Sequence, residues 1–131
     1  MTVLRRALYL DALLSAAVGV LLVVVPGTVL DLLGQPHPPD RAWLRLLGVA
    51  AFTLALLMVL VGHRVEELWW WSWAFVVLEV GAAAVGTLNA AFGLVSGAAA
   101  WPWWTFAALS WAFAAWILWG LARAGVERPP P

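Results

Sequence analysis

Four long apolar segments, separated by short polar or proline-rich breaks, constrain the fold of this 131-residue chain more than any other feature. Each segment is long enough to cross the roughly 30 Å hydrocarbon core of a bilayer as a helix. Since 65% of the residues are hydrophobic and only 11% are charged, so short a chain has no aqueous fold that could bury its apolar surface. The sequence therefore predicts an all-α polytopic membrane protein, an up-down bundle of four transmembrane helices at about residues 7–25, 41–62, 68–95 and 102–122.

The breaks between the segments carry residues that stop or start helices. Pro26-Gly27 ends the first helix, and residues 28–34 form a short amphipathic piece that we expect to lie in the interface. Three prolines in residues 35–39 exclude a helix there, and Asp40 is a good N-cap for the second helix. Residues 1–122 thus form one four-helix transmembrane domain.

The placement of the seven arginines predicts the orientation in the membrane. Five lie on the side that holds both termini, namely Arg5, Arg6, Arg64, Arg123 and Arg128, and the opposite side holds Arg41 and Arg45. We therefore expect a multi-pass protein of the bacterial inner membrane with both termini cytoplasmic. The tail, residues 123–131, ends in three prolines and is predicted to be disordered and cytoplasmic.

The eleven tryptophans cluster where the predicted helices meet the membrane surface. This is the distribution of an interfacial aromatic belt, in which the amphipathic rings lie at headgroup level. The alternative is an aromatic cage for a cation or a quinone. Ten residues belong to the belt, Trp43, Trp69, Trp70, Trp71, Trp73, Trp101, Trp103, Trp104, Trp116 and Trp119, whereas Trp111 falls in the middle of a helix.

Glu79 is the most informative residue because it lies near the bilayer midplane, where an ionisable group costs several kcal/mol. It falls on a small-and-polar helix face together with Asn89. Three interpretations stay open: a neutral carboxyl that donates a hydrogen bond inside the bundle, a proton or cation site used in transport, or a carboxylate paired with Arg45. The candidate proton or ion site therefore comprises Glu79, Asn89 and Arg45.

Two further patterns concern helix packing. Ala82, Gly86 and Ala90 form a small-xxx-small ladder on the Glu79 face, which favours close helix contact within the bundle or in a homo-oligomer. Asp11 is expected to be shallower than Glu79 and to form a helix-pinning ion pair with Arg64. The first and third helices also share a faint similarity, with Leu10-Asp11 and Leu78-Glu79 each followed by a run of small residues, which would fit a duplicated helical hairpin.

Several classes of function are excluded or disfavoured by what the sequence lacks. With no Cys and two His, thiol chemistry is excluded, and we expect no metal or cofactor site. No clustered basic face indicates nucleic-acid binding, and no phosphate loop, nucleophile elbow or zinc-binding helix indicates an enzyme. The expected partners are the lipid bilayer, another membrane protein or further copies of the chain.

The segment from Arg6-Ala7-Leu8-Tyr9 to Gly34, followed by Leu44-Arg45-Leu46-Leu47-Gly48, resembles small bacterial four-helix membrane proteins of the DoxX-like kind. The resemblance covers about the first half of the chain and implies the four-helix fold, without assigning any functional residue. Small multidrug-resistance transporters match the chain in size, but they place their essential carboxylate in the first helix, whereas the deep carboxylate predicted here is Glu79.

The leading functional hypothesis is a non-enzymatic inner-membrane protein, either an accessory or assembly subunit or a small autonomous bundle. The alternative is a small oligomeric transporter or channel that is coupled to protons or cations through Glu79. A membrane enzyme acting at the outer face is the third hypothesis.

Overall fold

The computed structural model describes residues 1–127, and within them every regular element is a helix. Four helical spans are long and apolar enough to cross a membrane, which confirms the predicted four-helix, all-α architecture. The elements are α1 (Thr2–Val24), α2 (Pro26–Leu32), α3 (Ala42–His63), α4 (Val65–Leu68), the 3₁₀ helix η1 (Trp69–Ser72), α5 (Trp73–Phe92) and α6 (Trp101–Glu127).

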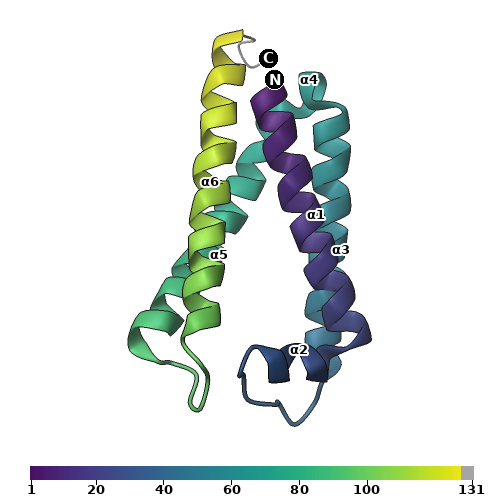
Figure 1. Ribbon diagram of the computed structural model, residues 1–131. Coiled ribbons are helices and arrows are strands. Elements are labelled where there is room, and N and C mark those ends of the chain that lie inside the picture. Colours follow the sequence, from purple (N-terminus) through teal and green to yellow (C-terminus); the bar gives the residue numbers. More distant parts are fainter. Residues whose placement is uncertain (128–131) are drawn as a thin grey trace.

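The bundle consists of two helical hairpins, α1 with α3 and α5 with α6, and the main helix packing between them joins α1 to α6. Figure 1 shows the hairpins close together at the end that holds both termini and α4, and further apart toward the end that holds α2. We call these the terminal end and the loop end. Core residues come from all four spans, including Leu8 of α1, Met58 of α3, Phe75 of α5 and Ile117 of α6. The hairpins are thus held together mainly by this shared core.

The third span is not one continuous α-helix. It begins with α4, tightens into η1 over the tryptophan run, and continues as α5. Trp69 is only 8% exposed and belongs to the core, so it packs against protein at the start of the third span. The span ends at Phe92, before the predicted Val95, because Gly93 adopts a left-handed conformation with φ of 57° that ends a helix.

Close approach of helices occurs where glycines face a neighbouring helix. A Cβ added at Gly19 of α1 would lie 2.7 Å from the carbonyl oxygen of Gly48 in α3. A Cβ at Gly120 of α6 would lie 2.8 Å from the Cα of Leu4 in α1. Because both neighbours are backbone atoms, these glycines set how closely the helices approach.

The helix ends differ from the predicted ones at both termini of the chain. α1 begins at Thr2, well before residue 7, and Arg5 donates a hydrogen bond from Nε to the Gly62 carbonyl at the end of α3, 3.1 Å away. α6 continues to Glu127, whose carboxylate pairs with the amino group of Met1 at 3.1 Å. The prediction of disorder is therefore wrong for residues 123–127, and residues 128–131 lie outside the described residues. Asp40 accepts a hydrogen bond from the Ala42 N–H at 2.8 Å, but the N-cap of α3 is Arg41, one residue after the predicted cap.

Candidate functional site

Glu79 is buried among the helices, with 7% of its surface exposed. It is the fifteenth residue of the 28-residue span Val65–Phe92, which places it near the middle of the membrane. Ser110 of α6, itself 5% exposed, donates a hydrogen bond to its carboxyl group. This burial confirms the prediction that Glu79 faces protein. The prediction rested on the cost of exposing an ionisable group to lipid, which offers it no partner.

Asp11 is a second buried carboxyl at the same level. It is the tenth of the 23 residues of α1 and is 2% exposed, so it is not shallow as predicted. The reason is that α1 begins at Thr2, which shifts Asp11 toward the middle of its span. The Asp11 and Glu79 carboxyls lie close enough to repel each other when both are charged. We call Asp11 and Glu79 the carboxyl pair.

The surroundings of the carboxyl pair supply hydroxyl groups. Ser15, one turn along α1, donates to Asp11 Oδ1 at 3.4 Å, and Asp11 Oδ2 is buried without a hydrogen-bond partner. Within residues 1–127, no Arg or His side chain forms an ion pair or hydrogen bond with either carboxyl. The pair is therefore a buried, acidic site between the two hairpins, and Asp11 Oδ2, buried without a partner, is costly while this carboxyl is charged.

The ion pairs predicted for these acids do not form. Arg64 lies at the terminal end, where α3 gives way to α4, and it pairs with the neighbouring Glu67 instead of Asp11. Arg45 lies in the first turn of α3 at the loop end, is exposed, and points away from the bundle, so it cannot reach Glu79. Both predictions are wrong for the same reason. Arg64 and Arg45 lie near the two ends of α3, too far along the membrane normal from Asp11 and Glu79.

The remaining predicted residues have local roles. Asn89 lies about 15 Å along the helix from Glu79 and donates to the Val85 carbonyl of its own helix at 2.9 Å, so it does not join the site. Gly86 packs against Ala107 of α6, and a Cβ there would lie 3.2 Å from the Ala107 Cβ. Ala82 and Ala90 are half-buried beside it, so the ladder faces α6 within the chain.

No group of three His, Asp or Glu side chains in residues 1–127 is arranged to hold a metal ion. The two carboxyls can bind and release protons, and the hydroxyls of Ser15 and Ser110 donate hydrogen bonds to them. Sequence reasoning missed Asp11 as a member of this site, although the similarity of the first and third spans aligns Asp11 with Glu79.

No protein-family model, curated protein or solved structure matches this chain, so the resemblance to the DoxX-like proteins stays a prediction.

Proposed function

We propose that the protein is a small, non-enzymatic, proton-coupled membrane carrier in which the carboxyl pair takes up and releases a proton. The observation that carries this proposal is the burial of Asp11 and Glu79, from different hairpins and at the same depth, without a basic partner in residues 1–127. Ionisable side chains inside the membrane are expensive, and those that persist commonly mark ion or proton pathways.

The chemistry of two facing carboxyls favours proton binding. Two carboxylates that share a site cannot both ionise cheaply, and one shared proton removes the repulsion between them. Asp11 Oδ2 has no hydrogen-bond donor, so the bundle does little to stabilise the charged form of this carboxyl. Proton uptake therefore relieves the repulsion and removes a charge that the bundle does little to stabilise.

The position of the pair links protonation to the arrangement of the hairpins. α1 carries Asp11 and α5 carries Glu79, and the hairpins are joined mainly by α1 and α6 and by the shared core at the terminal end. Repulsion between two charged carboxyls favours separation of the hairpins, and protonation favours their approach. Sites between repeated halves, near the middle of the membrane, are typical of carriers that open alternately to the two sides.

We extend the proposal to assembly and orientation. Four helices enclose little space for a transported solute, so a homo-oligomer would complete the pathway. The terminal end carries Arg5, Arg6, Arg64 and Arg123 against Arg41 and Arg45 at the loop end. That excess supports cytoplasmic termini in a bacterial inner membrane.

The test is proton uptake by the purified protein in lipid nanodiscs, followed with a pH indicator and by infrared spectroscopy of the carboxyl groups. We expect the wild type to take up a proton on acidification. The double variant Asp11→Asn, Glu79→Gln should lose this uptake and remain folded, because both amides keep the shape and hydrogen-bonding capacity of the acids.

Glu67→Gln is the matched control, since Glu67 is an exposed acid that pairs with Arg64 at the membrane surface. This variant should keep the slow, buried carboxyl signal of the wild type. Equal uptake by the wild type and the double variant would overturn the proposal, and so would loss of the signal in the control alone.

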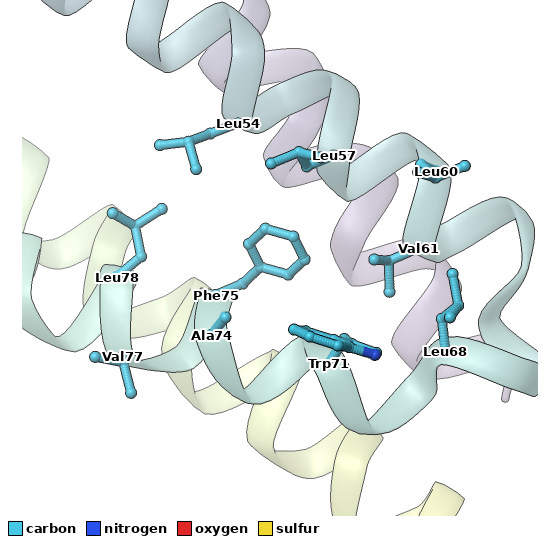
Figure 2. A pocket seen from close by; sticks show the side chains of 10 residues that line it. All are labelled: Leu54, Leu57, Leu60, Val61, Leu68, Trp71, Ala74, Phe75, Val77 and Leu78. Atoms are coloured by element: carbon cyan, nitrogen blue, oxygen red, sulfur yellow. The ribbon is translucent and has the colours of Figure 1, made fainter.

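An accessory or assembly subunit is the second candidate, and the open side between α3 and α5 favours it. Figure 2 shows that apolar side chains of both helices, such as Leu57 and Phe75, line a pocket there. Native mass spectrometry after mild extraction separates the candidates. Other polypeptides carried at a fixed ratio would support a subunit, whereas a homo-oligomer would support the carrier.

A further inference from the structure

A basic hollow lies on the outer surface of α3 at the loop end, remote from the carboxyl pair. Arg41 and Arg45 stand one helical turn apart on its wall, and Leu46 and Val49 continue it toward the membrane interior. Asp40 and Ala42 complete the lining. The hollow thus combines two guanidinium groups at headgroup depth with an apolar floor.

Arg41 is held in place by its neighbours. Its Nη2 lies 3.3 Å from His37 Nδ1, and His37 Nε2 lies 2.6 Å from Asp31 Oδ1. The guanidinium also rests on α2, since a Cβ added at Gly27 would lie 2.8 Å from Arg41 Nη1. The chain from Asp31 through His37 therefore orients this cation before any ligand binds.

Arg45 has no such support. Its side chain forms no ion pair or hydrogen bond with any of residues 1–127. Asp40, the acid in the lining of the hollow, accepts a hydrogen bond from the Ala42 N–H at 2.8 Å. A guanidinium at the edge of the hydrocarbon region is stabilised by an anion that offsets its charge, and residues 1–127 place none against Arg45.

We propose that Arg41 and Arg45 bind the phosphate of an anionic phospholipid whose acyl chain lies along Leu46 and Val49. Guanidinium groups match phosphate oxygens in geometry and charge. Phospholipid phosphates lie at the depth of the first turn of a spanning helix, and basic pockets at helix ends recognise such headgroups.

Two features select a lipid over other anions and an anionic lipid over a zwitterionic one. The apolar floor offers nothing to free phosphate, but it continues the path of an acyl chain from the headgroup inward. The lining holds two arginines and one aspartate, which already accepts a hydrogen bond from the Ala42 N–H, so an ammonium group on the headgroup would meet mainly cations.

The experiment is native mass spectrometry of the full chain in a mild detergent, titrated with phosphatidylglycerol, phosphatidylcholine or inorganic phosphate. We expect one phosphatidylglycerol to bind more tightly than phosphatidylcholine, and inorganic phosphate not to displace it. Arg45→Gln should weaken the binding of phosphatidylglycerol about fivefold, and Arg41→Gln with Arg45→Gln about 25-fold. Circular dichroism checks that both variants remain helical.

Arg6→Gln is the matched control, because Arg6 is also an exposed arginine in the first turns of a spanning helix, but at the terminal end. It should leave the affinity for phosphatidylglycerol unchanged. Equal binding of the two lipids, an unaltered affinity in Arg45→Gln, or an equal loss in Arg6→Gln would each overturn the proposal. Displacement of phosphatidylglycerol by inorganic phosphate in the millimolar range would also overturn the proposal. The hollow would then bind a free anion and not a lipid.

Discussion

The α1–α6 seam and the α3–α5 seam are the two places where the hairpins can meet, and they differ sharply. α1 and α6 pack closely, with Leu4 and Ile117 fully buried. α3 and α5 are not among the helix pairs that pack extensively, and Leu57 of α3 remains 46% exposed. If the hairpins are duplicates, these seams are equivalent by descent, yet one is closed and the other open.

Side-chain size accounts for the difference. The closed seam has Gly120 opposite the backbone of Leu4, so the two helices approach without obstruction. The open seam is lined by larger side chains, leucines together with Trp71 and Phe75, and a pocket lies between the two helices there (Figure 2). In a membrane the lipid is as apolar as these side chains, so apolarity alone does not draw the helices together. Small residues therefore decide which seam closes.

Filling the closed seam should have the largest effect. Gly120→Leu places a side chain against the backbone of Leu4, which cannot move aside without parting α1 from α6. We expect the free energy of unfolding to fall by about 3 kcal/mol. The measurement is equilibrium unfolding in mixed micelles titrated with a denaturing detergent.

Two matched variants sharpen this comparison. Gly81→Leu makes the same change on α5, where a Cβ would meet nothing within 4 Å, and Ala74→Leu enlarges a side chain in the open seam. Both should leave the unfolding free energy within about 0.5 kcal/mol of the wild type. A loss in Ala74→Leu as large as that in Gly120→Leu would show that the open seam is tightly packed in the membrane.

Apolar substitutions of the two carboxyls should change the free energy of unfolding less than Gly120→Leu does, and one should raise it while the other lowers it. Asp11→Leu removes a buried oxygen that lacks a partner, so we expect it to raise the unfolding free energy by about 1 kcal/mol. Glu79→Leu removes the acceptor for Ser110 and should lower it by about 0.6 kcal/mol. The same unfolding titration measures both, and destabilisation by Asp11→Leu would mean that Asp11 has a stabilising partner in the membrane.

The sequence was sufficient for the number of spans, the α2 segment and the burial of Glu79, because each depends on local composition or on the cost of a charge in lipid. It was insufficient wherever a partner had to be chosen across helices. Arg45 and Arg64 were matched to acids by approximate depth, and a shift of five residues in the start of α1 was enough to separate Asp11 from Arg64.

Helix crossings were also partly beyond the sequence. The ladder around Gly86 was visible as a four-residue repeat, whereas Gly19, Gly48 and Gly120 are isolated glycines whose partners lie on other helices. Trp69 was placed in the belt because its neighbours in sequence are tryptophans, and only the 3₁₀ turn of η1 directs it into the core. Such choices depend on tertiary packing.

The smallest effect on stability should come from the loop end, where one side chain joins the hairpins outside both seams. Gln35 Nε2 donates to the Ala99 carbonyl at 3.1 Å, and Gln35 Oε1 accepts from Trp103 Nε1 at 3.1 Å. Gln35→Leu removes both bonds but keeps the Ala99 N–H bonded to the Gly34 carbonyl at 2.9 Å. Because these groups lie near water, we expect a loss of only about 0.5 kcal/mol.

Although Gln35→Leu should change stability little, we expect it to increase the distance between the hairpins at the loop end, where they already diverge (Figure 1). The chain has no cysteine, so spin labels at Pro39→Cys and Ser96→Cys report this distance without background. We expect electron paramagnetic resonance to show a longer and broader distance distribution in Gln35→Leu, and no change for a label pair at the terminal end, where the shared core holds the hairpins. An unaltered distance distribution would mean that the Gly34–Ala99 backbone bond alone holds the loop end together. The hairpins could then separate only in the middle of the membrane, beside the carboxyl pair.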